Sequence, residues 1–299
     1  MRITLSGATG FLGRHLVSRL VEEGHSICLL ARQPVTGLPS SVDTLLWNPP
    51  RVAPPPEAFD GVDAVIHLAG ASVNQRWTAQ AKALLRSSRL DSTRSLVQSL
   101  STLSRRPGIF LSASATGVYG DRGDEVLTES SSEGEGFLAQ LSVDWEREAN
   151  LARALGLRVN CLRTGVVLGM EGGALPSMLP VFRLGAGGKL GNGQQWMSWI
   201  HVEDWTSSVL HLLRSEVASG PFNLTAPEPS RNADFTHTLG KVLRRPAFLT
   251  VPEFGLRLVF GEMSTILLAS QRVLPDALLK SGFEFRYPGL ESALRSLLQ

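Results

Sequence analysis

Short apolar runs alternate with longer, helix-patterned segments along the first half of the chain. The runs predict strands over residues 2–6, 25–32 and 61–70, and leucines at helical spacing follow the first run, from Leu12 to Leu20. Strands that alternate with helices form parallel sheets that carry helices on both faces. The pattern therefore predicts an α/β fold built on a doubly wound parallel sheet.

The alternation continues through the middle of the chain. It predicts a helix over residues 79–104, a strand that ends at Ser112, a helix over 137–155 and a strand over 157–163. The proline-rich stretch 47–59 can form neither a helix nor a central strand. We therefore expect it to be a surface connection.

Composition and charge mainly exclude certain partners and kinds of site. The 29 basic and 27 acidic residues leave a net charge of +2, which is too even to indicate a nucleic acid or a membrane surface as partner. The six histidines have no paired spacing with cysteines or acids, so no metal site is expected. Cys28 and Cys161 lie inside apolar runs, which indicates buried free thiols rather than a disulfide.

The start of the chain and its apolar runs bear on localisation. No run reaches the roughly 18 residues of a membrane-spanning helix. A strand pattern begins at Arg2, which leaves no room for a signal peptide. Together with the free thiols, these features predict a cytoplasmic protein.

Three glycines stand between the first predicted strand and the first predicted helix. Gly7 permits the tight turn, Gly10 lets backbone approach a pyrophosphate, and Gly13 lets the helix and the strand pack closely. The N–H groups and the positive dipole end of the helix then attract phosphate. The sequence therefore predicts a dinucleotide site at this turn.

The end of the second predicted strand distinguishes the two nicotinamide dinucleotides. An acidic residue there would bind a ribose 2′-hydroxyl, but this chain has Arg32, followed by Gln33. A guanidinium pairs with a 2′-phosphate in two hydrogen bonds and gains little from a hydroxyl. We therefore expect NADP(H) as the cofactor, with an arginine that merely solvates the strand end as the alternative.

Four motifs carry a resemblance to a known family. They are GATGFLG at 7–13, HLAG at 67–70, SASATGVYG at 112–120 and WIHVED at 199–204. Together they resemble the extended short-chain dehydrogenases/reductases, the group that includes nucleotide-sugar epimerases.

Further stretches narrow the resemblance. SSRLDST at 87–93, residues 163–204 and FNLTAPEPSRNADF at 222–235 are similar to an atypical branch, the epimerase family or cell-division-inhibitor-like proteins. Members of that branch end in a small domain of unknown function, which residues 244–294 match.

The resemblance implies a domain organisation. Residues 1–163 form an NADP(H)-binding Rossmann domain, and residues 164–299 form mainly a smaller substrate domain. Segments of the second part return to the Rossmann sheet, so that the two parts are partly interleaved. The last part, 244–299, is the small family-specific region.

The resemblance also implies which residues hold the cofactor. The arginine of the related SRL motif helps to bind it, although a surface arginine on an amphipathic helix explains Arg89 equally well. The expected cofactor-binding residues are Gly7, Thr9, Gly10, Phe11, Leu12, Gly13, Arg32, Leu68, Ala69, Gly70, Arg89, Ser112, Gly165 and Val166.

The catalytic pair of the superfamily is missing from this chain. Most members carry Tyr-x-x-x-Lys on the helix after SASATGVYG, where the lysine lowers the pKa of the tyrosine and the tyrosine exchanges a proton with the substrate oxygen. Here the residues four positions after the two tyrosines are Gly123 and Glu291. If Glu146 takes the place of the acid that usually follows the lysine, Leu138 occupies the tyrosine position and Ser142 the lysine position.

Other residues remain as catalytic candidates. Ser114 matches the catalytic serine or threonine of the superfamily, but one extra residue before VYG leaves Ser112 as an alternative. Tyr119 occupies the VYG position, where relatives use the tyrosine to shape the substrate pocket, and a substitute catalytic role for it stays open. Asp144 and Glu146 are expected on a solvated charged face.

On the substrate side we expect His201 to be structural and the glycine-rich stretch 185–193 to be a flexible substrate-side loop. Three functions remain: an NADP(H)-dependent reductase of an unknown small molecule, a nucleotide-sugar epimerase, and a non-catalytic NADP(H)-binding redox sensor. Loss of the dyad argues against the epimerase, which needs acid-base chemistry twice. The oligomeric state stays open, a homodimer included.

Overall fold

Seven parallel strands form the central sheet of the computed structural model, which describes residues 1–49 and 51–299. They are β1 (Arg2–Ser6), β2 (Ser26–Ala31), β3 (Val42–Leu46), β4 (Ala64–His67), β5 (Ile109–Ala115), β7 (Arg158–Thr164) and β12 (Gly220–Leu224). The strand order is β12-β7-β5-β4-β1-β2-β3, and each neighbouring pair is parallel. The order of the strands reverses between β1 and β4, the place where ligands bind in such sheets.

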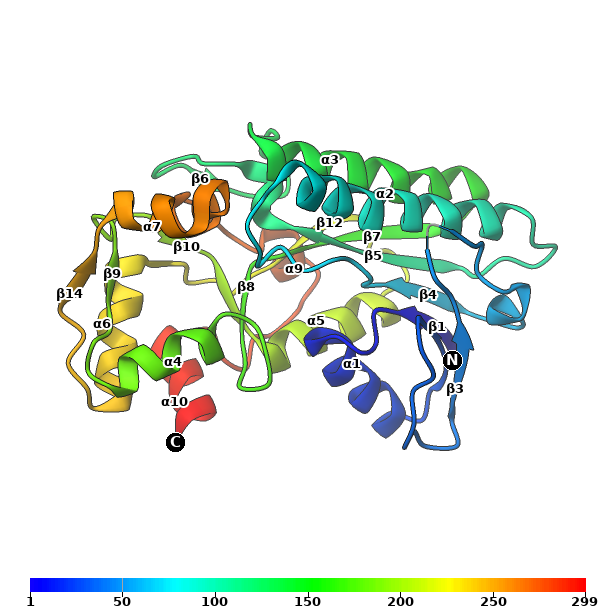
Figure 1. The fold of residues 1–299 in the computed structure, drawn as a ribbon. Helices are drawn as coiled ribbons and strands as arrows, with labels where there is room; N and C mark the ends of the chain where they lie inside the picture. Colours follow the sequence, from blue (N-terminus) through cyan, green and yellow to red (C-terminus); the bar gives the residue numbers. More distant parts are fainter. Residues whose placement is uncertain (50) are drawn as a thin grey trace.

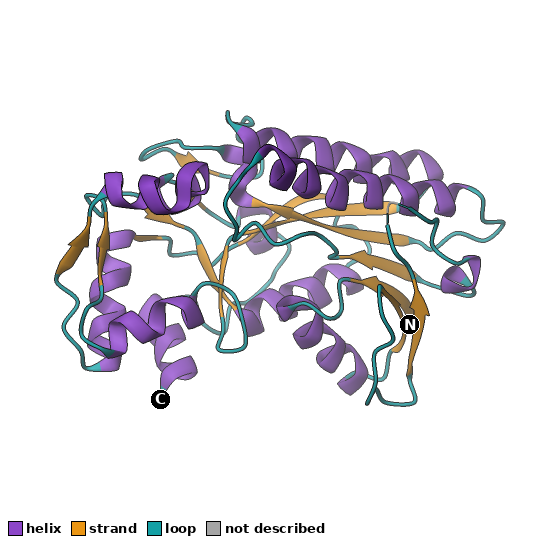
Figure 2. Cartoon of the chain, in the orientation of Figure 1, coloured by secondary structure: helices purple, strands orange, loops and turns teal. Residues whose placement is uncertain are grey.

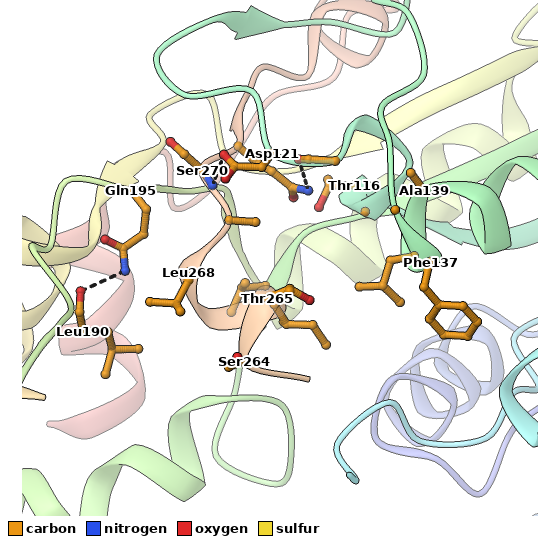
Figure 3. A pocket seen from close by; sticks show the side chains of 18 of the residues that line it. Thr116, Asp121, Phe137, Ala139, Leu190, Gln195, Ser264, Thr265, Leu268 and Ser270 are labelled. Carbon is orange, nitrogen blue, oxygen red and sulfur yellow. Dashed lines mark hydrogen bonds between the residues drawn. The ribbon is translucent and has the colours of Figure 1, made fainter. Parts of the chain in front are cut away.

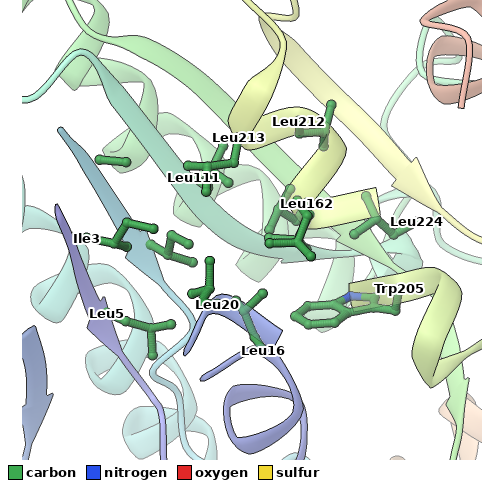
Figure 4. Packing of buried hydrophobic residues seen from close by; sticks show 14 of the residues in the cluster. Ile3, Leu5, Leu16, Leu20, Leu111, Leu162, Trp205, Leu212, Leu213 and Leu224 are labelled. Carbon is green, nitrogen blue, oxygen red and sulfur yellow. The ribbon is translucent and has the colours of Figure 1, made fainter. Parts of the chain in front are cut away.

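Helices cover both faces of the sheet (Figures 1 and 2). On one face lie α1 (Phe11–Glu22) and α5 (Val202–Arg214), and on the other lie α2 (Ala79–Ser101) and α3 (Phe137–Asn150). Buried apolar side chains fill the space on each face, and Figure 4 shows the cluster between the sheet and α1 with α5. The strands are buried on both faces, which explains why they read as continuous apolar runs rather than as alternating ones.

A smaller region follows at the carboxyl edge of the sheet (Figure 1). Its helices are α4 (Leu175–Arg183), α6 (Asn232–Leu243), α7 (Glu253–Phe260), α8 (Ser264–Leu268) and α10 (Leu290–Leu298), whereas α9 (Asp276–Lys280) packs against β12 of the sheet. Short strand pairs lie within this region or between it and the rest: β8 (Val166–Leu168) with β11 (Trp199–His201), β9 (Gly188–Leu190) with β14 (Leu249–Val251), β10 (Trp196–Met197) with β13 (Ser230–Arg231), and β6 (Val126–Leu127) with β15 (Arg272–Val273). Its own core includes Leu179, Phe182, Trp199, Phe235 and Leu294.

The two parts of the chain are interleaved. Strand β12 returns to the sheet beside β7, and α5 packs against α1, although both belong to the second half of the sequence. The doubly wound sheet with a smaller C-terminal region was therefore predicted correctly. The proposed boundary at residue 163 stays a prediction.

Several local predictions were wrong. Helix α2 ends at Ser101 rather than at residue 104, and β5 runs on to Ala115. The helix predicted over 137–155 divides into α3 and a 3-10 turn over Leu151–Leu155. The stretch 185–193 contains β9, which pairs with β14, so it is not a simple loop.

The proline-rich connection also differs from expectation. Trp47 and Phe59 are buried in the core on the α2 side of the sheet, and residues Pro56–Phe59 form a 3-10 turn. Strand β3 precedes the connection and was not predicted. The connection therefore anchors the edge of the sheet through its apolar ends; its Pro50 lies outside the described residues.

Both cysteines are buried and free, as predicted. Burial raises the pKa of the Cys28 thiol to about 11 and raises that of Cys161 as well. Within the residues that the structure describes, no helix combines the length and the apolar character needed to cross a membrane.

Candidate functional site

Two glycines at the turn between β1 and α1 have no space for a side chain. A Cβ on Gly7 would lie 2.6 Å from the carbonyl carbon of Leu68, and Gly7 has a φ of +84°. A Cβ on Gly13 would lie 2.2 Å from the Gly7 oxygen. The expected close packing of helix on strand is therefore present, and it brings the turn against the Leu68–Ala69 backbone at the end of β4.

The first turn of α1 is free for an anion. Gly10 is the N-cap residue, no side chain caps the helix, and no acidic residue lies in its first turn. The N–H groups of Phe11, Leu12 and Gly13 therefore lack the partners that capping would supply. This arrangement fits the diphosphate of a dinucleotide. Thr9 is exposed beside it, and its carbonyl accepts a hydrogen bond from Arg14 Nη1 at 2.7 Å.

Arg32 and Arg89 place positive charge at the same edge of the sheet. Arg32 directly follows β2 and is exposed. Arg89 projects from α2 toward Gly70, where its guanidinium donates to the Ala71 carbonyl at 3.0 Å and lies 5.2 Å from the centre of the Trp145 ring. Burial lowers the pKa of Arg89 to about 10, so the group remains a cation at neutral pH. Both guanidiniums fit an anionic cofactor.

The loop after β8 covers the start of α1. A Cβ on Gly169 or on Gly172 would lie 2.4 or 2.5 Å from the Phe11 ring. His15 Nε2, one turn along α1, lies 2.8 Å from Glu171 Oε2 of the same loop. Phe11 therefore binds this loop with its side chain, and only its backbone faces the anion site.

His67 supports the strand end from inside. Its ring is fully buried, with Nδ1 2.5 Å from Ser6 Oγ and Nε2 3.2 Å from Ser92 Oγ. The Ser92 hydroxyl donates to the Ser88 carbonyl, so His67 Nε2–H donates to Ser92 and Nδ1 accepts from Ser6. Burial lowers the pKa of His67 to about 3. The imidazole is therefore a neutral structural group.

A cleft of about 1110 Å³ opens between the carboxyl edge of the sheet and the C-terminal region (Figure 3). The sheet side contributes Thr116, Gly117, Leu138, Ser142, Gly165 and Val166, and the C-terminal side contributes Leu190, Gln195, Glu253, Thr265, Leu268 and Gln271. A Cβ on Gly117 would lie 3.5 Å from Leu138 Cβ and 3.9 Å from Ser142 Oγ. The two positions that the sequence assigned to the missing dyad thus face the cleft together.

Thr116 is the residue that sequence reasoning missed. Ser112 and Ser114 are buried outside the cleft lining, whereas Thr116, two residues further on, is part of that lining (Figure 3). Ser114 Oγ donates to Glu146 Oε1 at 2.6 Å, so its hydroxyl is already engaged. No sequence signal pointed to Thr116, because the extra residue before VYG led to Ser112 as the alternative to Ser114.

Tyr119 lies in a buried polar network behind the cleft. Its side chain is fully buried, its hydroxyl donates to Asn223 Oδ1 at 2.7 Å, and Arg163 Nη1 donates to the same hydroxyl at 2.9 Å. Burial raises the pKa of the phenol, although Arg163 opposes this effect. The network joins η2 (Thr116–Tyr119) to β7 and β12.

Glu146 belongs to the same network, and its assignment to a solvated face was wrong. Its carboxylate is buried and accepts from Arg163 Nε at 2.8 Å and from Arg163 Nη2 at 2.9 Å. Asp144, on the outer face of α3, pairs with Arg86 at 2.8 Å and with Arg147 at 3.3 Å. The two carboxylates therefore differ because α3 turns one of them toward β7.

His201 and Asp204 fasten the C-terminal segment. His201 Nδ1 accepts from the Glu203 N–H at 3.0 Å, and its ring lies 4.0 Å from that of Tyr287. Asp204 accepts from the backbone N–H groups of Arg286 at 2.8 Å and of Tyr287 at 2.9 Å. Burial lowers the pKa of His201 to about 4. The structural role expected of His201 agrees with these contacts.

The glycine turn and the uncapped helix at the switch point of the sheet are the features that Rossmann-type dinucleotide-binding folds share, and the two arginines lie at the same edge. Family comparison leads to the same class. Residues 3–225 match the NAD dependent epimerase/dehydratase family, and residues 251–297 match a domain of unknown function, DUF1731. The chain belongs to this epimerase family.

Similar proteins match the chain over essentially its whole length. Epimerase family protein YfhF of Bacillus subtilis is 38% identical over 299 residues, covering 100% of this chain and 98% of YfhF. The chloroplastic SDR39U1 homolog of Arabidopsis thaliana is 38% identical and aligns with 100% of this chain and 87% of its own length. The crystal structure of human SDR39U1 with NADPH has 31% identity and a TM-score of 0.89, with 99% of both chains covered.

Proposed function

We propose that this chain is an NADP(H)-dependent reductase of a small molecule that binds in the cleft. The turn with the uncapped helix fits a diphosphate, and the exposed guanidinium of Arg32 at the end of β2 fits a 2′-phosphate. The human relative crystallised with NADPH supports the same cofactor. When bound, NADPH supplies a hydride. The chain's own residues bind and orient the two partners.

The observation that carries the proposal is the cleft face of α3. Leu138 and Ser142 line the cleft beside Gly117, so substrate meets an apolar side chain and a hydroxyl where other members place their acid-base pair. Thr116 offers a second hydroxyl on the same side. These groups can hydrogen-bond a substrate oxygen, but they do not exchange protons readily at neutral pH.

Tyr119 and Ser114 have a different role in this proposal. Both hydroxyls are engaged with Arg163 or Glu146 behind the cleft, so they fix the position of the strand end that presents Thr116. Epimerisation at a sugar carbon needs a proton taken and returned, and the cleft face lacks the pair that does so. A non-catalytic NADP(H) sensor is the remaining alternative, and it differs from the reductase in having no turnover.

Turnover distinguishes these alternatives. NADPH oxidation is followed by absorbance with a panel of uncharged carbonyl compounds, for the wild type and for Thr116→Val and Ser114→Ala. We expect measurable oxidation, with Thr116→Val lowering kcat/KM about tenfold through loss of one substrate hydrogen bond and leaving NADPH affinity unchanged. We expect Ser114→Ala to act mainly on stability. Bound NADPH without oxidation across the panel would favour the sensor.

A further inference from the structure

The cations that line the cleft are already paired. Arg231 lies 2.9 Å from Asp124, and Arg257 lies 2.5 Å from Glu253. A phosphate or carboxylate on the substrate would have to displace one of these carboxylates. Among the described lining residues, no arginine, lysine or histidine remains without a carboxylate partner. The lining is therefore poorly suited to a nucleotide diphosphate or another anion.

One wall of the cleft is aromatic. Trp77 and Phe137 pack edge to face with ring centres 5.4 Å apart, and both line the cleft. The Lys82 ammonium lies 5.0 Å from the centre of the Phe137 ring and pairs with Glu262 at 2.5 Å. A second cation at this wall would meet the charge of Lys82. The wall therefore suits a flat, uncharged ring.

The acids of the cleft lie on its rim. All five carboxylate residues in the lining are exposed: Asp121, Asp124, Glu135, Glu253 and Glu262. By contrast, Thr116 and Ser142, which line the side next to the sheet, are 7% and 4% exposed. A substrate oxygen beside them gains hydrogen bonds, but the described lining supplies no buried titratable group to protonate it.

The presence of hydroxyls without a buried acid determines which kind of carbonyl compound suits the cleft. Reduction of a simple ketone leaves an alkoxide, which is about as strong a base as hydroxide, whereas reduction of a quinone leaves a phenolate, whose conjugate acid has a much lower pKa of about 10. The phenolate can leave the cleft and take its proton from water. A cleft with hydroxyls and no buried acid therefore suits the second product far better.

We propose that the cleft binds uncharged, flat, conjugated carbonyl compounds of the quinone class. The proposal rests on the proposed reductase function and names its substrate class. In the balanced reaction the quinone gains two electrons and one hydrogen as hydride from NADPH. One proton from water then completes the hydroquinone, and NADP⁺ is the oxidised product.

Binding can be tested without turnover. The chain saturated with NADP⁺ is titrated calorimetrically with 1,4-naphthoquinone, with 1,4-naphthoquinone-2-sulfonate and with UDP-glucose. We expect naphthoquinone to bind at least about tenfold more tightly than its sulfonate, because the added anion finds no free cation, and UDP-glucose to bind most weakly. Equal or tighter binding of the sulfonate or of UDP-glucose would overturn the proposal.

A matched pair of variants locates the ligand. Phe137→Ala should weaken naphthoquinone binding about tenfold through loss of one aromatic wall, while the affinity for NADP⁺ stays the same. Phe248→Ala, whose ring is 78% exposed and outside the cleft lining, should change neither. Unchanged naphthoquinone affinity in folded Phe137→Ala would contradict the location. If that variant does not fold, the comparison of naphthoquinone, its sulfonate and UDP-glucose on the wild type still tests the proposal.

These outcomes separate the two proposals. Failure of the wild type to bind NADP⁺ or NADPH removes the reductase itself. Normal cofactor binding and turnover of other carbonyls, combined with no naphthoquinone binding, removes only the substrate class. Naphthoquinone binding without NADPH oxidation keeps the cleft ligand and removes the catalytic function.

Discussion

The cofactor edge and the substrate face of this molecule are constrained in different ways. At the cofactor edge, backbone atoms approach so closely that Gly7 and Gly13 have no room for a Cβ. On the substrate face, Leu138 and Ser142 stand on α3 beside open space in the cleft. A side chain there can change without moving the backbone. Backbone packing therefore restricts the residue type at Gly7 and Gly13, whereas the cleft positions on α3 can accept different side chains.

Helix α3 shows both kinds of constraint within three turns. Its cleft face carries the two altered positions, Leu138 and Ser142. One turn further, Glu146 is fixed by Arg163 and Ser114 inside the protein. The same helix therefore carries cleft positions without an acid-base pair and a buried ion pair that holds it against β7.

The largest effect is expected from breaking that ion pair. Glu146→Ala should lower the free energy of unfolding by about 3–5 kcal/mol, because the Arg163 guanidinium then stays buried without its carboxylate. Asp144→Ala, on the same helix but paired with the exposed Arg86 and Arg147, should cost under about 1 kcal/mol. Urea unfolding of both variants measures the difference. Equal costs would mean that the buried pair contributes no more than a surface pair.

A substitution in the glycine turn should lower the affinity for NADPH. Gly13→Ala places a Cβ 2.2 Å from the Gly7 oxygen, a backbone clash that only a shift of α1 can relieve. We expect NADPH affinity to fall at least about 100-fold, since the helix N-terminus moves away from the diphosphate. Gly255→Ala, where a Cβ would meet nothing within 4 Å, is the control. NADPH titration of a folded Gly13→Ala that binds like the wild type would refute the packing argument.

Buried His67 should make stability depend on pH. Its folded pKa of about 3 lies below the unfolded value of 6.5, so the unfolded chain binds more protons between these limits and stability falls as pH drops through 6.5. At pH 5 the loss from this residue is about 2 kcal/mol.

Chemical unfolding at pH 7 and pH 5 tests this effect. His67→Gln should lose about 2 kcal/mol less than the wild type between the two pH values, although it starts from a lower stability. His237→Gln serves as control, because its exposed ring contacts solvent in both states. An unchanged pH difference in His67→Gln would show that the ring is not held neutral.

The sequence was informative where backbone geometry dictates residue type. The glycine turn and the parallel strands follow from steric and burial requirements, whereas the return of the chain to the sheet was implied by the family resemblance; the structure agrees with both. Side chains whose neighbours come from distant segments were harder to predict. Glu146 was predicted to be solvated because its partner Arg163 lies on β7, far from it in the local sequence. Trp47 was predicted to lie in a surface connection because prolines follow it, yet its ring packs into the core.

The hydroxyl that lines the cleft could not be identified from the sequence. The extra residue before VYG led to Ser112 as the alternative to Ser114, and only the structure shows that neither serine lines the cleft and that Thr116 does. The missing dyad, in contrast, could be counted directly because the chain has two tyrosines and neither is followed by a lysine at the required spacing.

The most direct test of this account compares the two dinucleotides. Calorimetric titration of the wild type and of Arg32→Asp with NADPH and NADH measures whether the cofactor edge is intact and what it recognises. We expect the wild type to bind NADPH at least about tenfold more tightly, because the guanidinium pairs with the 2′-phosphate, and Arg32→Asp to abolish or reverse the preference. Equal affinity of the wild type for NADPH and NADH, or no binding of either, would contradict it.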